Sequence, residues 1–193
     1  MTTATTGSNT ASLYIGGEWT APDSDETIEV TNAATEQVMG SVPAGTEADV
    51  DAAVGAANAA RGVWSAFEPS QRAEICTAIG ARLQDRAEEI AGLISQELGS
   101  PITEAMMIQA ALPAITFTSM EHLYEHLPWE QTLGNSLIVR EPAGTVGAIT
   151  PWNYPLHQIA AKVAPAMLAG CTIVVKPSEV TPLNSYVLAE IID

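Results

Sequence analysis

Two short apolar runs near the end of the sequence constrain the fold more than any other feature. GTVGAI at 144–149 and CTIVVKP at 171–177 have the length and the β-branched content of buried strands, and the alanine-rich segment 156–170 between them has the length of a helix. Two strands joined by such a crossover pair in parallel, with a right-handed connection. The sequence therefore predicts an α/β fold with a β-α-β-α unit over residues 143–193.

Each predicted strand is followed by a turn that carries a polar side chain. The turn TPWNYP places Asn153 after the first strand, and the turn KPSE begins with Lys176 at the end of the second strand. Ligands of parallel sheets gather at the carboxyl ends of the strands, so we expect both residues at one binding edge. From its position alone Asn153 also fits a helix N-cap, because asparagine is a leading cap residue.

The remainder of the chain divides into four segments by its hydrophobic periodicity. Residues 1–12 are polar and predict a short disordered leader, with neither the basic nor the apolar region of a signal peptide. Residues 13–45 contain short extended runs and a Gly-Gly hairpin signal at 16–17, and they predict a β meander. Residues 46–127 have the spacing of amphipathic helices, and residues 128–142 return to strand character.

Local signals set the boundaries of the predicted helices. Thr46 with Asp49 three residues later is the acidic form of a capping box, which predicts a helix start. Gly99 and Pro101 predict the end of a later helix. Pro113 lies inside a further helical segment, and we expect it to kink or divide that helix because it removes a backbone donor.

Charge and cysteine content exclude several classes of function. The net charge of −16, with 7 basic against 23 acidic residues, repels phosphate groups, so neither nucleic acid nor an anionic membrane is an expected partner. No apolar stretch has the length and the freedom from charge of a membrane span. Cys76 and Cys171 have no metal-ligand spacing around them, and His122, His126 and His157 predict no metal site. These features predict a cytoplasmic protein without a disulfide framework or a bound metal.

The order of these elements and several sequence strings resemble the aldehyde dehydrogenase superfamily. VGAITPWNYPLHQIAAKVAPAMLAG and TIVVKPSEVTPL hold the Pro-Trp-Asn turn and the Lys-Pro-Ser-Glu turn at the family's separation. LYIGGEW, VTNAATEQVMGSVPAGTEADVDAAVGAA and QRAEICTAIGARL extend the resemblance over nearly the whole chain. The resemblance implies the first, truncated β-α-β-α unit of an incomplete Rossmann-like cofactor-binding domain.

The same resemblance implies a function and an assembly. Members of the family oxidise an aldehyde to a carboxylic acid with NAD or NADP, through a thiohemiacetal on a catalytic cysteine. The β meander at 13–45 and the string NSLIVR resemble strands that build a sheet shared between subunits. We therefore expect a small-molecule aldehyde as substrate and, in the complete enzyme, a homo-oligomer that is a dimer or a tetramer.

The resemblance gives Asn153 a catalytic role. Asn153 matches the asparagine whose side-chain amide donates to the thiohemiacetal oxyanion. A neutral donor at a strand-to-helix turn stabilises developing negative charge without itself titrating. The resemblance thus favours an oxyanion donor over a helix cap at this position.

The resemblance also implies a cofactor site. Lys176 matches the lysine that reaches the hydroxyls of the adenosine ribose, and Glu179 matches the acidic residue at the same ribose. A carboxylate there favours a free 2′-hydroxyl over a 2′-phosphate, so NAD is the expected cofactor and NADP the alternative. Other residues of the cleft are implied to shape its turns and its backbone wall: Ile149, Thr150, Pro151, Trp152, Pro177 and Ser178.

Three residues near the crossover helix have less specific assignments. Tyr154 resembles an aromatic residue that lines the aldehyde tunnel. Lys162 matches a family lysine linked to proton movement, but a solvated helix surface fits its position equally well. For His157 a position on the surface and a position in the tunnel lining fit equally well. Cys171 has no histidine or positive charge beside it in sequence, so it is not the expected nucleophile.

The resemblance covers only the N-terminal part of the family pattern, because the sequence ends at Asp193. The family's glycine-rich cofactor turn, its general-base glutamate and its nucleophilic cysteine have no counterpart here. Without that cysteine the thiohemiacetal cannot form, so we expect an N-terminal fragment that is inactive alone. The alternative is a non-catalytic remnant or interaction module, which the open edge of an unfinished sheet disfavours.

Overall fold

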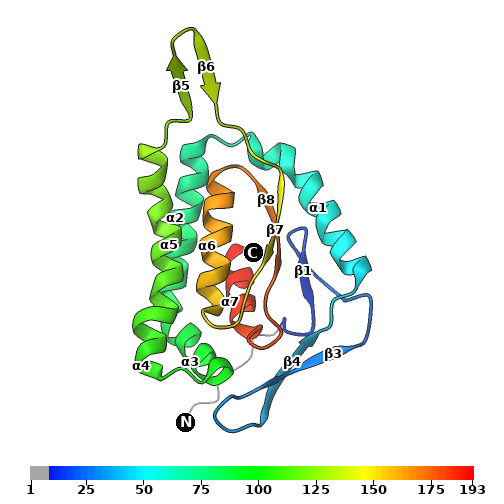
Figure 1. Ribbon diagram of the computed structural model, residues 1–193. Coiled ribbons are helices and arrows are strands. Elements are labelled where there is room, and N and C mark those ends of the chain that lie inside the picture. The colour runs from blue at the N-terminus through cyan, green and yellow to red at the C-terminus, as the bar shows by residue number, and fades with distance from the viewer. Residues whose placement is uncertain (1–8) are drawn as a thin grey trace.

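The computed structural model describes residues 9–193, and Figure 1 shows how their helices and strands are arranged. The first half contains β1 (Leu13–Ile15), β2 (Glu18–Thr20), β3 (Thr27–Thr31), β4 (Val38–Pro43), α1 (Glu47–Ser65), α2 (Pro69–Asp85) and α3 (Ala87–Leu98). The second half contains α4 (Ile102–Glu104), the π-helix η1 (Ala105–Ala110), α5 (Ala111–His126), β5 (Glu130–Leu133), β6 (Ser136–Val139), β7 (Thr145–Ile149), α6 (Pro155–Leu168), β8 (Thr172–Lys176) and α7 (Leu183–Ile192).

The predicted β-α-β-α unit is confirmed. β7 and β8 pair in parallel from Thr145 opposite Thr172 to Ile149 opposite Lys176, and α6 forms the crossover between them. Both α1 and α6 contact the two strands, which lie between these helices in Figure 1. The pairing therefore places the ends of both strands at the same edge.

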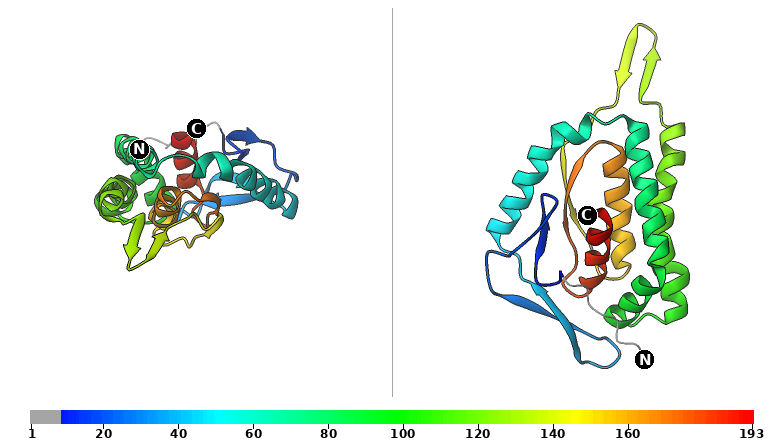
Figure 2. Two further views of the ribbon diagram at one scale, coloured as in Figure 1. Left: turned by 90° about the horizontal axis from the view of Figure 1, so that it is seen from above. Right: turned by 180° about the vertical axis from the view of Figure 1, so that it is seen from behind.

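A layer of helices holds most of the apolar core. Helices α2, α5 and α6 contact one another and run side by side in both views of Figure 2. Their inner faces meet those of α3 and α7 around fully buried side chains, among them Leu83, Ile90, Ile94, Phe117 and Ile159. Such burial stabilises the fold by roughly 1.5–3 kcal/mol for each large apolar side chain. None of the described helices combines the length and the hydropathy that a bilayer span requires.

Two of the predicted helix boundaries are confirmed by their capping geometry. Thr46 accepts from the Asp49 N–H, and the Asp49 carboxylate accepts from the Thr46 N–H at 2.8 Å, which completes the capping box of α1. Gly99 ends α3 with a φ of 79°, in the left-handed region that glycine tolerates best.

The predicted break at Pro113 lies on the N-terminal side of the proline. Pro113 itself is inside α5, and the preceding residues 105–110 form the π-helix η1. A proline lacks the N–H that would bond to the carbonyl four residues earlier and its ring crowds that carbonyl, here the carbonyl of Gln109. The wider π-helical turn accommodates both effects, so the helix is distorted rather than divided.

The predicted β meander over 13–45 is wrong as a single sheet. The antiparallel pairs β1–β2 and β3–β4 are present, but they form two separate ribbons among the described residues. The first ribbon docks on α7, where Trp19 stacks on Tyr186 with ring centroids 6.0 Å apart. The second ribbon buries Val30 and Val42 against the helical core. The two ribbons thus pack on different apolar surfaces, the first on α7 and the second on the helical core.

The predicted leader is partly folded. Residues 1–8 lie outside the described residues, but residues 9–12 form a turn in which the Ser12 N–H donates to the Asn9 carbonyl at 2.9 Å. The Tyr186 hydroxyl donates to the Ser12 carbonyl at 3.2 Å, which ties this turn to α7. The prediction of disorder is therefore wrong for residues 9–12.

The predicted strand segment at 128–142 is a hairpin of β5 and β6. The two strands pair antiparallel from Glu130 opposite Val139 to Leu133 opposite Ser136, with a turn at Gly134 and Asn135. Figure 1 shows that the hairpin projects from the end of the helical layer, and all eight strand residues are exposed.

Arg72 connects α2 to the ends of two other helices. Its side chain is 4% exposed, and its Nε donates to the Leu168 carbonyl at 2.9 Å. Its Nη1 donates to the carbonyl oxygens of Ser65 and Phe67. Burial lowers the pKa of this guanidinium, which still keeps its charge. Arg72 thus supplies donors to backbone acceptors at the C-terminal ends of α1 and α6.

Glu97 accepts hydrogen bonds from the backbone at the start of α7. Its carboxylate accepts from the backbone N–H groups of Leu183 (2.5 Å) and Asn184 (3.3 Å) and from the Asn184 side-chain amide (2.9 Å). The Glu97 residue is 2% exposed. A carboxylate at this position satisfies N–H groups that have no partner within the helix and complements its dipole.

We predict that Gly170→Ala destabilises the fold. Gly170 has a φ of +82°, and an added Cβ would lie 2.9 Å from Pro142 Cγ and 3.3 Å from Arg72 Cζ. The left-handed backbone alone costs a non-glycine residue about 1–2 kcal/mol, and the contacts add to this. Urea unfolding of the 193-residue chain measures the loss. Gly62→Ala in α1, where a Cβ meets no atom within 4 Å, is the control and should be neutral or stabilising.

We also predict a pH dependence from Glu97. Burial raises the pKa of Glu97 from its usual 4.5 to about 7, against the opposing effect of its three donors. The folded chain then holds this proton more tightly than the unfolded chain. The contribution of Glu97 to the free energy of unfolding is thus fully present below about pH 4.5 and is lost as the pH rises through about 7.

Urea unfolding across this pH range tests the assignment with two variants. In Glu97→Gln this part of the pH dependence should disappear, whereas Glu88→Gln, at an exposed position of the same helix, should keep it. Parallel pH profiles for the wild type and Glu97→Gln would refute the assignment.

Candidate functional site

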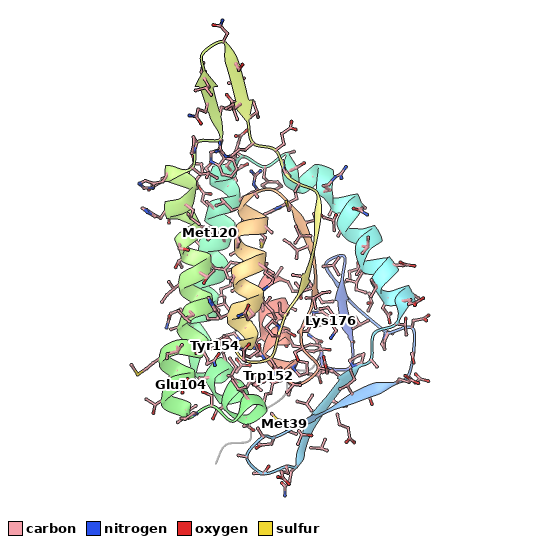
Figure 3. All side chains as sticks on the ribbon, viewed as in Figure 1. Met39, Glu104, Met120, Trp152, Tyr154 and Lys176 are labelled. Carbon is pink, nitrogen blue, oxygen red and sulfur yellow. The ribbon has the colours of Figure 1, made fainter. Side chains whose placement is uncertain are left out.

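The parallel strand pair brings the two predicted turns together at its carboxyl edge. The Thr150 N–H donates to the Lys176 carbonyl at 3.2 Å, directly after the register pair of Ile149 and Lys176. Trp152, Tyr154 and Lys176 lie at the same end of the molecule in Figure 3. The expectation that both turns share one edge is therefore confirmed.

The first turn leaves the Asn153 side chain free. Asn153 is exposed, and its amide has no hydrogen-bond partner within residues 9–193. The residue at the N-cap position of α6 is Tyr154, which makes no side-chain cap bond, and the helix begins with Pro155. Proline fits this first position because it has no N–H to satisfy. Helix capping by Asn153, the alternative that the sequence left open, does not occur.

Gln109 is a residue of this site that the sequence did not indicate. It lies on the π-helix η1, is 2% exposed, and donates from Nε2 to the Asn153 carbonyl at 3.3 Å. Its Oε1 is buried without a partner among the described residues. The signal in the sequence was Pro113, four residues later, because π-helical turns often occur at functional sites.

The second turn carries an exposed ion pair. Lys176 Nζ lies 3.0 Å from Glu179 Oε2, and both side chains are about 60% exposed, at 61% and 59%. The Glu179 N–H and the Lys176 ammonium together hold the pKa of the Glu179 carboxyl below its usual value. Ser178 Oγ accepts from the Val180 N–H at 3.3 Å and so stabilises the turn. An ammonium has three donors, so Lys176 can bind a further acceptor beside Glu179.

An apolar rim joins the two turns. Ile149 is 75% exposed and Trp152 is 51% exposed, and Pro151 between them is also exposed. Thr150 is buried, and its Oγ1 has no partner in the described part of the chain. This edge therefore combines a neutral donor, an exposed flat aromatic side chain and a cation, which suits a ligand with both apolar and polar parts.

Lys162 and His157 lie on α6, beyond the first turn. Lys162 Nζ donates to the carbonyl and to the side-chain Oε1 of Gln158, at 3.3 Å each, so its amine bonds to its own helix. His157 is half-buried, and its Nδ1 is enclosed without a partner among residues 9–193. Tyr154 is likewise half-buried. The role of Lys162 in proton transfer and the role of Tyr154 in substrate binding remain predictions.

Neither cysteine of the chain is placed to act as a nucleophile. Cys76 is fully buried, and burial raises the pKa of its thiol to about 12. Cys171 is buried as well, and both cysteines are free. Because the thiolate is the nucleophile, the Cys76 thiol, which burial keeps protonated, is inert, and Cys171 is enclosed by the fold.

Two features lie away from this edge. A cleft of about 440 Å³ at the base of the β5–β6 hairpin is lined by Arg72, Tyr124 and Trp129, among others, and by none of the predicted site residues. Contrary to the expectation that the histidines form no cluster, His122 and His126 lie together near the end of α5, with ring centroids 4.1 Å apart. Glu125 lies with them, and one potential ligand atom of each of the three residues lies within 4.8 Å of those of the other two.

Comparisons with known proteins agree with this architecture. The family model described as "Aldehyde dehydrogenase family" matches residues 19–193. A 3-succinoylsemialdehyde-pyridine dehydrogenase of a Pseudomonas species is 44% identical over 182 residues, which cover 94% of this chain and 38% of that protein.

Solved structures give the same result. Aldehyde dehydrogenase C of Pseudomonas syringae, a variant in complex with NAD+ and octanal, superposes with a TM-score of 0.94 and 43% identity, over 97% of this chain and 39% of that one. An aldehyde dehydrogenase of Mycobacterium tuberculosis in complex with NAD+ superposes with a TM-score of 0.90 and 39% identity, over 94% and 39% of the two chains. The 193 residues thus span less than half of the length of these relatives, and within that span the chain belongs to the aldehyde dehydrogenase family.

Proposed function

We propose that this chain provides the oxyanion donor and the adenosine-ribose contacts of an NAD-dependent aldehyde dehydrogenase. One observation carries the proposal. The free amide of Asn153 lies at the same strand edge as the Lys176–Glu179 pair, because β7 and β8 are parallel. On this proposal residues 143–193 are the first unit of the cofactor-binding domain, and residues 46–127 are its helical part.

Asn153 stabilises the thiohemiacetal oxyanion. Its Nδ2 group is exposed, is not used in helix capping and carries no charge of its own to be neutralised. The Gln109 amide holds the Asn153 backbone through the bond to its carbonyl. This bond fixes the backbone from which the donor projects, and one such donor typically lowers the barrier by roughly 3–4 kcal/mol.

The residues at the second turn fit the adenosine end of NAD. When NAD is bound, its nicotinamide ring accepts the hydride of the substrate. The ribose hydroxyls can both donate and accept, so they suit the Lys176 ammonium and the Glu179 carboxylate together. The same carboxylate repels a 2′-phosphate, which favours NAD and leaves NADP as the alternative. Ile149, Thr150, Pro151 and Trp152 form the wall beside it, and Ser178 shapes the turn.

The chain by itself is proposed to be inactive towards aldehydes. The family mechanism needs a thiolate nucleophile, and the two cysteines here are buried, with the pKa of Cys76 raised to about 12. Catalysis then requires a nucleophile and a general base from a further segment. The alternative, a non-catalytic remnant or interaction module, would leave the free Asn153 amide without a role.

We propose a small-molecule aldehyde as substrate, a cytoplasmic location and a homo-oligomer, a dimer or a tetramer, in the complete enzyme. The two free cysteines support a reducing compartment. Exposed apolar side chains on the β5–β6 hairpin, Leu133, Leu137, Ile138 and Val139, support an intersubunit surface there. Tyr154 is proposed to line the aldehyde path and Lys162 to take part in proton transfer.

A chimera tests the two roles. In the chimera, residues 9–193 replace the matched segment of the Pseudomonas syringae enzyme. The two chains superpose with a TM-score of 0.94. Asn153→Ala should lower kcat by about a hundredfold to a thousandfold with little change in the KM for NAD, because the donor acts when the oxyanion forms. Lys176→Ala should mainly raise the KM for NAD.

The matched control is Asn135→Ala, an exposed asparagine in the turn of the β5–β6 hairpin, and it should leave both parameters unchanged. The assignment is wrong if Asn153→Ala and Lys176→Ala change the same parameter to the same degree. An inactive parent chimera whose fold is intact would show that this segment cannot serve the family reaction.

A second prediction concerns the 193-residue chain alone. Its turn at Lys176 contacts only the adenosine end of NAD, so calorimetry should detect weak binding or none. We expect no aldehyde-dependent formation of NADH under the same conditions. A dissociation constant of about 1 µM, equivalent to about −8 kcal/mol, would contradict this prediction and favour a self-sufficient binding module.

A further inference from the structure

The last two turns of α5 carry three potential metal ligands on one face. His122, Glu125 and His126 are spaced i, i+3 and i+4, so their side chains project from the same side of the helix. One ligand atom of each residue lies within 4.8 Å of those of the other two. The two imidazole rings are 4.1 Å apart between centroids, at an angle of 43°.

A hydrogen bond prepares His126 for metal binding. His126 Nδ1 lies 2.8 Å from the His122 carbonyl oxygen. A carbonyl oxygen only accepts, so Nδ1 carries the proton, and Nε2 of the neutral ring keeps its lone pair for a ligand. Metal-binding histidines usually donate their second ring N–H to a carbonyl or carboxylate, which fixes both the tautomer and the ring orientation.

The position on the helix favours a cation. α5 ends at His126, and Leu127 is its C-cap, so the three residues lie in its last two turns, near the end at which the carbonyl groups point outward. The helix dipole gives this end a partial negative charge that attracts cations. The Glu125 carboxylate adds a full negative charge beside the two imidazoles.

We propose that His122, Glu125 and His126 form a binding site for a divalent transition-metal ion of the Zn²⁺ class. Two imidazoles and one carboxylate suit Zn²⁺, Co²⁺ or Ni²⁺ better than Ca²⁺ or Mg²⁺, which prefer sets of oxygen ligands. Zinc bonds to nitrogen are about 2.0–2.1 Å long, so rotations of the exposed His122 and Glu125 side chains towards the fixed His126 ring close the observed spacing around one ion.

The proposed site is separate from the strand edge and binds rather than catalyses. It lies at the C-terminal end of α5, beside the β5–β6 hairpin, whereas Trp152 and Tyr154 lie towards the opposite end of the helical layer (Figures 1 and 3). All three ligands are exposed, so water completes the coordination of the ion. A bound ion would cross-link the last two turns of α5, next to the segment that leads into the hairpin.

Calorimetric titration of the 193-residue chain with ZnCl₂, and separately with NiCl₂, tests the site. We expect one saturable ion per chain. His122→Ala and His126→Ala should each weaken binding by at least about tenfold. Loss of a residue that only supports a metal ligand already weakens metal binding by about that factor, and these residues are the ligands themselves. Glu125→Gln should weaken it less, and Glu121→Gln, an adjacent exposed residue outside the group, should have no effect.

Thermal unfolding gives an independent measurement. Ligand binding to the folded state raises Tm, so Zn²⁺ should raise the Tm of the wild type and not that of the double variant His122→Ala/His126→Ala. Equal binding by this double variant would assign the metal to other carboxylates of the acidic surface and overturn the proposal. Absence of saturable binding by the wild type would also overturn it.

Discussion

The parallel pairing of β7 with β8 is the constraint on which the candidate site depends. A parallel pair requires a crossover, and α6 supplies it, so both strands end at the same edge. The bond from the Thr150 N–H to the Lys176 carbonyl continues the pairing into the first residues of the turns. Asn153 and the Lys176–Glu179 pair are 23 and more residues apart in sequence, yet this geometry places them on one surface.

Two buried charged side chains stabilise the helices around that pair. Arg72 donates to the carbonyl oxygens at the end of α6, and Glu97 accepts from the N–H groups at the start of α7. Helix ends leave these backbone groups without partners, and an unpaired buried polar group costs about 1–3 kcal/mol. Arg72 is paired with backbone carbonyl groups, and Glu97 with two backbone N–H groups and the Asn184 side-chain amide. The far end of α6 carries the Asn153 turn, so its position depends on the same contacts.

The residues of the site were predictable to different degrees, for physical reasons. Asn153 and Lys176 follow β-branched runs, and the carboxyl end of a parallel strand is a known binding position. Pro113 indicated a distorted helix near Gln109, but the contact of Gln109 with Asn153 was not predictable, because it joins two segments that are distant in sequence. For His122 and His126 the spacing was visible in the sequence, but the shared orientation and the locked tautomer of His126 required the structure.

The sequence alone determined the α/β class, the parallel unit at 143–193, the capping box at Thr46 and the family resemblance, because these rest on periodicity, caps and turns that act over a few residues. Only the tertiary structure decided that the strands before Thr46 form two ribbons and that residues 9–12 are folded. It also left the Asn153 amide free. These outcomes depend on contacts with apolar surfaces and backbone groups of segments that are distant in sequence. Local sequence patterns do not encode such contacts.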